Sequence, residues 1–357
     1  KKVFLFIILI ILFFIFFIFD PRNAMIYNLI SIKEVIIPLL SILIGYKYLN
    51  ENDDSFNIIN YLYLIFITYG VVQEITFFAS DLAKILPWDY RYIQDILQEK
   101  IATNIFQGPL LRFFGTMNSF VEYQVLSVYL CLLLILNKDK IKNKLILKLN
   151  VILLIIFLIM CLERSPILMF LITLIIWKIP FINLQKLIKI ALWFIVLMIL
   201  LLNNIELIKN NPYFSTAFER LENVITFIIS KDEAIQEREE GNWKEAINLA
   251  ISNPFGIGIG RIVGADGRKN YVAPHNSFLF FYLGYGFWGF ILFLISIMIL
   301  VINMLKLEKK YKYFGIGMIL SFLMMGWFNL PFTGKQGIIF YLVMGYLLNI
   351  KKKSCNR

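Results

Sequence analysis

Charged residues are scarce in this chain, and that scarcity excludes most classes of protein. Asp, Glu, Lys and Arg make up 17% of the 357 residues, hydrophobic residues make up 59%, and the mean hydropathy is +0.74. Soluble domains contain about 25% charged and roughly 45–50% apolar residues. The composition therefore excludes a soluble globular fold and a disordered chain, and it predicts an all-α polytopic integral membrane protein.

Cysteine and histidine are also rare. The three cysteines, Cys131, Cys161 and Cys355, lie in two apolar runs and in the last few residues, so their spacing offers neither a disulfide framework nor a metal site. The single histidine, His275, cannot hold a metal ion alone, and no cysteines or carboxylates cluster around it. The sequence contains no P-loop, Asp-rich magnesium motif or Ser–His–Asp arrangement. We therefore expect no metal and no cofactor.

Long apolar runs supply the expected architecture. A bilayer core of about 30 Å is crossed by about 20 apolar residues in a helix. Ten segments fit this requirement approximately: residues 3–19, 25–46, 58–80, 119–136, 145–162, 165–178, 187–208, 277–304, 313–330 and 335–350. The first is too long for a signal peptide and lacks a small-residue cleavage site, so we count it as a span. We predict about ten transmembrane helices.

The basic residues set the expected orientation, because short cytoplasmic loops are enriched in Lys and Arg. With the N-terminus inside and alternating spans, the inside segments hold 19 of the 35 Lys and Arg, including the tail Lys351–Lys353. The chain then divides into N-terminal transmembrane helices (1–208), one large extracytoplasmic loop with short helices (209–276), and C-terminal transmembrane helices with a basic cytoplasmic tail (277–357).

Arginine is distributed differently from lysine in this topology. Eighteen lysines lie inside and seven outside, whereas only one of the nine arginines, Arg357, lies inside. The outer arginines are Arg22, Arg91, Arg112, Arg164, Arg220, Arg238, Arg261 and Arg268. The planar guanidinium donates hydrogen bonds in a fork that suits phosphate or carboxylate. Either these arginines pair with acidic residues of the loops, or the outer face binds an anionic ligand.

The loop 209–276 carries the remaining candidates. Its run Asn253–Gly260 contains alternating glycines, which let backbone amides approach a phosphate, although a plain turn between helices explains them equally well. His275 lies where the chain re-enters the membrane. Histidine titrates near neutral pH and suits proton transfer, although a wet residue at a membrane boundary is an equally ordinary interpretation.

Several motifs in this region resemble the O-antigen ligase and O-antigen polymerase superfamily. They are Trp243 followed by Asn253-Pro254-Phe255-Gly256-Ile257-Gly258, then Pro274-His275-Asn276-Ser277-Phe278-Leu279, and then Gly284-Tyr285-Gly286-Phe287-Trp288-Gly289. Arg112–Ser119 and Glu163-Arg164-Ser165 resemble weaker motifs of the same superfamily, so the likeness extends over about residues 110–350. Its members often have about twelve helices; the ten expected here, and a first residue other than Met, suggest a truncated start.

The resemblance implies glycan transfer from an undecaprenyl diphosphate carrier to an acceptor sugar hydroxyl, on the outer face of the bacterial cytoplasmic membrane. The acceptor would be a glycan or the lipid A-core of lipopolysaccharide. The expected partners are these two substrates and membrane lipids, with no nucleic acid, nucleotide sugar, cofactor or metal. The course implied is inversion by direct attack on the anomeric carbon. The resemblance does not separate ligase from polymerase.

The resemblance also assigns roles to individual residues. Arg164 and Arg238 are the first candidates for binding the diphosphate, followed by Arg220 and Arg112. Either Arg220 or Arg238 matches the loop arginine of the superfamily. His275 would take the proton of the acceptor hydroxyl or orient that hydroxyl. The residues expected to support the loop are Trp243, Pro254, Gly256, Gly258 and Asn276.

A secondary transporter or a flippase for lipid-linked glycans is the alternative. Such proteins carry internal repeats and ionisable residues at mid-membrane. Lys33, Glu34 and Glu74 are the ionisable residues within expected spans, and the sequence shows no convincing repeat. Adjacent residues do not share a helix face, so snorkelling or a shifted span explains Lys33 and Glu34 more simply.

Overall fold

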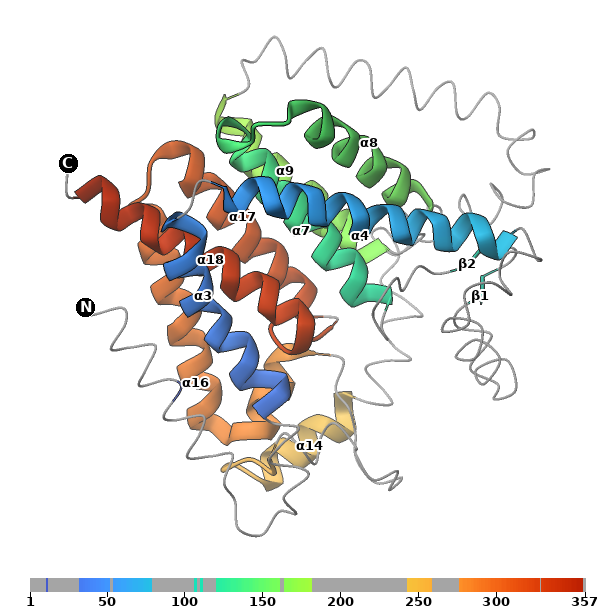
Figure 1. Cartoon of the computed structure of the whole chain (residues 1–357). Helices are drawn as coiled ribbons and strands as arrows, with labels where there is room; N and C mark the ends of the chain where they lie inside the picture. Colours follow the sequence, from blue (N-terminus) through green and yellow to red (C-terminus); the bar gives the residue numbers. More distant parts are fainter. Residues whose placement is uncertain are drawn as a thin grey trace. The chain divides into compact units, whose positions relative to one another are not determined.

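The structure is a computed structural model, which describes residues 11, 32–51, 54–78, 106–107, 110–111, 120–160, 164–181, 243–258, 276–327 and 329–355. Within these residues the protein is helical except for one small hairpin (Figure 1). The hairpin pairs β1 (Phe106–Gln107) with β2 (Leu110–Leu111) in antiparallel register. The α-helices are α3 (Ile37–Glu51), α4 (Ser55–Phe78), α7 (Phe120–Leu136), α8 (Lys144–Met160), α9 (Arg164–Lys178), α14 (Lys244–Ser252), α16 (Ser277–Leu305), α17 (Lys309–Gly326) and α18 (Gly334–Cys355).

The described helices follow the predicted apolar segments closely. Every one of them except α14 coincides with a segment expected to span the membrane, and most ends agree within a few residues. The predicted spans 3–19 and 187–208 lie outside the described residues, apart from the helical Ile11. By length and apolar composition, two described helices qualify to cross a bilayer, α4 over Ser55–Val72 and α16. The all-α class is confirmed for the described part of the chain, and the number of spans stays a prediction.

The described residues form two compact units. One contains α3, α14, α16, α17, α18 and the α9 residues Met169–Trp177. The other contains α4, α7, α8 and the start of α9, whose first residue is Arg164.

In the first unit, α3 and α18 pack with their backbones unusually close (Figure 1). A Cβ atom added to Gly45 would overlap the carbonyl oxygen of Leu342, and one added to Gly345 would overlap that of Ile42. The hydroxyl of Ser41 donates to the carbonyl of Ile338 at 2.8 Å. Small residues bring helix backbones together in this way in membrane proteins, where van der Waals contact replaces a hydrophobic driving force.

The second unit is built on buried polar and aromatic contacts between α4, α7 and α8. The Tyr123 ring lies 4.4 Å from that of Phe66 and 5.6 Å from that of Phe157, and its hydroxyl donates to the carbonyl of Phe66. The Asn150 amide donates to the side-chain oxygen of Asn60 at 2.9 Å. Both asparagines are buried, so this bond satisfies groups that would be costly to leave unpaired.

Helix α16 is sharply bent rather than straight. Gly286 has φ 70° and ψ −171°, which is not helical. The rings of Phe281 and Phe293 stack at 4.2 Å, although twelve residues of straight helix would separate them by about 18 Å. The expected single span over 277–304 is therefore two segments, 277–285 and 287–305. The second is about 28 Å long and matches the bilayer core, whereas the first, at about 13 Å, is too short to cross it.

The close contact between α3 and α18 predicts a size limit at Gly45. Gly45→Val should destabilise the protein by about 1–3 kcal/mol, because the added methyl groups force two packed backbones apart. Ile44→Val, at an exposed neighbouring position on the same helix, is the matched control and should change stability little. Thermal unfolding in detergent measures both variants, and equal stabilities would show that the helices do not pack through Gly45.

Candidate functional site

The glycine-rich run and the bend in α16 are joined by main-chain hydrogen bonds. The Ile257 amide donates to the carbonyl of Leu283 at 2.6 Å, and the Gly258 amide donates to that of Gly284 at 3.2 Å. In the other direction, the Phe287 amide donates to the carbonyl of Pro254 at 2.9 Å. We call residues 254–258 the strap, because this segment runs along the bend. Two motifs that are separate in the sequence thus form one structural unit.

These hydrogen bonds compensate for the bend. In a continuous helix the Leu283 carbonyl would accept from the Phe287 amide, four residues later. With Gly286 out of helical conformation, that amide turns to Pro254 and the carbonyl accepts from Ile257. Unpaired backbone groups cost several kcal/mol where water is absent, so a bent helix near the membrane requires such replacements. The strap supplies them.

Glycine is required where the strap and the bend touch. A Cβ on Gly256 would lie 2.5 Å from the Gly286 nitrogen, and a Cβ on Gly286 would lie 2.5 Å from the Pro254 oxygen. Both have positive φ, 82° and 70°. The amides of Gly256, Ile257 and Gly258 all donate to main-chain carbonyls. The arrangement favours the turn interpretation of these glycines, since those amides are already engaged and do not face a phosphate.

Asn276 fixes the start of α16 to the turn between α17 and α18. Its side-chain oxygen accepts from the amides of Phe278 and Leu279 at 2.9 and 3.1 Å, as an N-cap. Its side-chain nitrogen donates to the Trp327 carbonyl at 3.1 Å, and the Ser277 hydroxyl donates to the Asn329 carbonyl at 3.0 Å. Asn276 and Ser277 are both buried. The residue that follows His275 in the chain is therefore held from two sides.

Aromatic rings join the same region. The Trp243 ring packs edge-on against that of Trp327 at 6.2 Å, and Phe278 contacts Trp327 at 5.8 Å. Helix α14 follows Trp243 directly and buries Ala246 and Ala250. The α17–α18 turn did not emerge from the sequence as part of the site. The only signal for it was a tryptophan and an asparagine at the end of an apolar run.

The predicted site residues divide into two groups. The structure brings Trp243, Pro254, Gly256, Gly258 and Asn276 together in one unit. Arg164 is the first residue of α9, in the other unit, and its side chain is not among those described. His275, Arg112, Arg220 and Arg238 lie outside the described residues. The roles assigned to the arginines and the histidine stay predictions.

A family comparison covers this region. Residues 149–294 match the model of a family described as O-antigen ligase. This part of the chain is similar to the O-antigen ligase family. The matched part begins in α8, includes Arg164, the strap and Asn276, and ends in α16 after the bend. The resemblance found in the sequence is confirmed, while no curated protein matches the chain.

The match to the O-antigen ligase family supports glycan transfer of the ligase or polymerase type in general. The family is integral to bacterial membranes, and the two apolar helices α4 and α16 are compatible with this. Lys33 and Glu34 form an ion pair at 3.6 Å although they are adjacent in the chain, and the Lys33 side chain is 70% exposed. A transporter would hold such charges inside its bundle. This pair therefore adds no support for the alternative.

The contact between the strap and the bend predicts that position 286 requires glycine. Gly286→Ala should destabilise the protein by about 1–3 kcal/mol, because its backbone conformation is essentially restricted to glycine. The added Cβ would also lie 2.5 Å from the Pro254 oxygen, so the strap would have to move. Trp288→Phe, at an exposed position two residues away, is the control and should lie within about 0.5 kcal/mol of the parent. Thermal unfolding of both proteins in detergent tests this; identical unfolding would remove the requirement for glycine.

Proposed function

We propose that this protein transfers an oligosaccharide or polysaccharide from an undecaprenyl diphosphate carrier to an acceptor sugar hydroxyl. The observation that carries the proposal is the O-antigen ligase match over residues 149–294, which contains every motif of the sequence resemblance except the segment at Arg112. The Asn276 cap supports it, because it fixes the residue that follows His275 in the chain.

In the proposed reaction the acceptor oxygen attacks the anomeric carbon of the donor sugar. The new C–O bond forms as the bond to the carrier diphosphate breaks, so the anomeric configuration inverts. His275 takes the proton of the hydroxyl or orients that hydroxyl, and the diphosphate leaves with the bonding electron pair. Every atom is accounted for without a metal, a cofactor or a nucleotide sugar.

The charge that develops on the leaving diphosphate requires stabilisation, and arginine is suited to provide it. We assign this role first to Arg164 and Arg238, then to Arg220 and Arg112. A bidentate guanidinium contacts two phosphate oxygens at once, and electrostatic stabilisation of this kind usually contributes more to catalysis than any other single effect. Eight of the nine arginines lie on the proposed outer face, where such a donor would be bound.

The location proposed is the bacterial cytoplasmic membrane, with loop 209–276 between the two groups of transmembrane helices and facing the exterior. A polymerase extends a glycan repeat by repeat, whereas a ligase moves a finished chain to an acceptor such as lipid A-core. Both reactions use the same donor chemistry, so the distinction depends on the acceptor.

Substitution of the two principal residues tests the catalytic assignment. His275→Ala and Arg164→Ala should each lower glycan transfer by about 100-fold or more, because each removes a group that acts in the transition state. Arg164→Lys should also lose glycan transfer, since a single ammonium group cannot replace the bidentate contact of a guanidinium. Surface polysaccharide is measured in a deletion strain complemented with each variant.

Arg357→Lys is the matched control, because Arg357 is the only arginine expected inside. Normal polysaccharide in both alanine variants would refute the catalytic assignment. The profile of the deletion strain also identifies the reaction. Single repeat units left on the acceptor indicate a polymerase, and unattached lipid-linked chains indicate a ligase.

Accessibility of single cysteines tests the side of the membrane. In a background with Cys131, Cys161 and Cys355 replaced by serine, Ser252→Cys should react with a membrane-impermeant maleimide in intact spheroplasts. Lys142→Cys should react only after lysis, because its loop is expected inside. Both positions are exposed in the structure. The opposite pattern would place the loop in the cytoplasm and overturn the mechanism.

A further inference from the structure

The segment of α16 after the bend presents one apolar stripe to its surroundings. Its exposed side chains recur every three or four residues from Leu294 onward, and Phe287 lies seven residues, about two turns, before Leu294, which places them on one face. Apart from Trp288 at its start, the exposed large apolar residues of this segment are Phe287, Leu294, Met298, Ile302 and Leu305. On a helix long enough to cross a bilayer, an exposed apolar stripe of this kind is typical of a surface that faces lipid.

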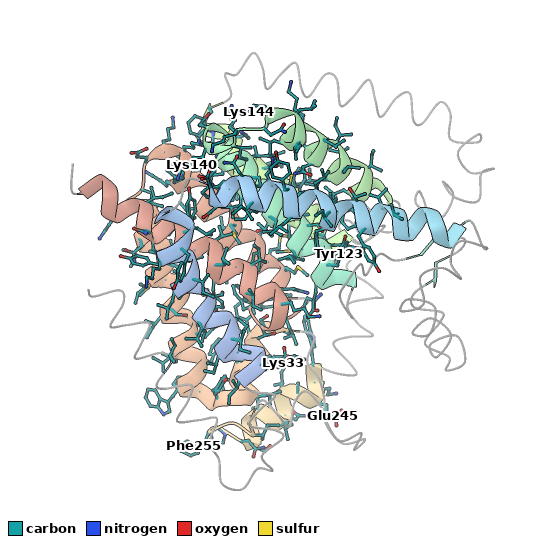
Figure 2. All side chains as sticks on the ribbon, in the orientation of Figure 1. Lys33, Tyr123, Lys140, Lys144, Glu245 and Phe255 are labelled. Atoms are coloured by element: carbon teal, nitrogen blue, oxygen red, sulfur yellow. The ribbon has the colours of Figure 1, made fainter. Side chains whose placement is uncertain are left out.

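The same apolar surface continues beyond the bend onto the strap and α14. Phe255 is 75% exposed and Ile251 is 73% exposed, although both are large and apolar. Because the Phe287 amide donates to the Pro254 carbonyl, Phe255 lies beside the first residue of the stripe, Phe287. Figure 2 shows Phe255 projecting away from the ribbon, at the opposite end of the α14 segment from Glu245. Trp288, 60% exposed, lies next in the chain to Phe287.

Helix α14 is amphipathic, and its apolar face is wider than the protein covers. Ala246 and Ala250 are buried, and Ile247 and Ile251, one residue further on, form an exposed row beside them. The opposite face is polar and exposed: Lys244, Glu245, Asn248 and Ser252. The helix therefore has three faces. One packs against the protein, the second is apolar and exposed, and the third is polar and exposed.

We propose that α14 and the strap are embedded in the lipid headgroup–acyl boundary, with Ile247, Ile251, Phe255 and Trp288 inserted into the leaflet. The bilayer is the occupant indicated because this surface is continuous with the lipid-facing stripe of α16. Amphipathic helices at membrane surfaces lie in the plane of the interface, with the apolar face buried. Tryptophan is enriched at the same level.

The length of α16 places the patch at the correct depth. From Phe287 to Leu305 the helix rises about 28 Å, close to the roughly 30 Å of a hydrocarbon core. After Leu305, where the helix would leave the hydrocarbon core, the chain carries the lysines Lys306, Lys309 and Lys310. If those lysines mark one membrane surface, the bend and the strap lie at the other. Loop 209–276, expected to be a free extracytoplasmic loop, is then tied to the membrane at this end.

This placement adds a physical consequence to the proposed function without depending on it. The polyprenyl chain of a lipid-linked donor stays in the bilayer, so its diphosphate is held at headgroup level. An embedded strap keeps residues 254–258 of the loop at that same level. A loop in free solution would first have to reach the membrane before it could bind the donor.

Spin labels on single cysteines test the immersion directly in the full-length protein. The background again has the three native cysteines replaced by serine, and the protein is reconstituted in vesicles of phosphatidylethanolamine and phosphatidylglycerol. Labels at Ile247→Cys, Ile251→Cys and Phe255→Cys should collide preferentially with oxygen rather than with a water-soluble nickel chelate. The ratio should correspond to a depth of about 5–10 Å below the phosphates.

Asn248→Cys and Ser252→Cys, on the polar face of α14, are the matched controls and should favour the nickel chelate. Free access of the chelate to Ile251→Cys and Phe255→Cys would mean that α14 lies in water, and the proposal fails. Protection of those labels from both reagents would mean that protein covers the patch, including a second copy of this chain, and the proposal fails equally. Neither result depends on glycan transfer, so the outcome is independent of the proposed enzyme activity.

Discussion

The arrangement around the candidate site depends on an exchange of main-chain hydrogen bonds at Gly286. A helix that bends so sharply leaves its own amides and carbonyls unpaired, and because residues 283–286 are buried, no water replaces them. Residues 254–258 satisfy three of these groups, and the contact is possible only because glycine stands at Gly256 and Gly286. The bend and the strap therefore require each other. Neither would be stable with an ordinary residue at these two positions.

This exchange of hydrogen bonds helps to position the chain on both sides of the strap and the bend. Before the strap, α14 lies against the protein through Ala246 and Ala250. At the start of α16, Asn276 and Ser277 are bonded to the α17–α18 turn. The two segments that border the predicted loop chemistry are thus fixed to one unit of the structure. Under the proposed function such rigidity would matter, because misplacement of a catalytic group by about 1 Å can cost roughly 100-fold in rate.

The helices were predictable, whereas the bend was not. Helices α7, α9 and α18 begin within one residue of the apolar segments that predicted them, because the length of an apolar run is a local property. The run after Asn276 is equally apolar on both sides of Gly286, so nothing in its hydropathy marks a break. Glycine is common in apolar helices. The sequence therefore could not show whether Gly284 or Gly286 leaves the helical conformation.

The sequence by itself determined the helical class, the helical segments and the likeness to the O-antigen ligase family, since these depend on composition, run length and motif order. The sidedness of arginine and lysine that it predicts stays a prediction. Only the tertiary structure decided what the glycines do. Whether an amide faces a phosphate or a carbonyl depends on which backbone lies opposite, and that neighbour, Gly286, is thirty residues away in the chain. Long-range contacts of this kind carry no local signal, and for that reason the strap emerged only from the fold.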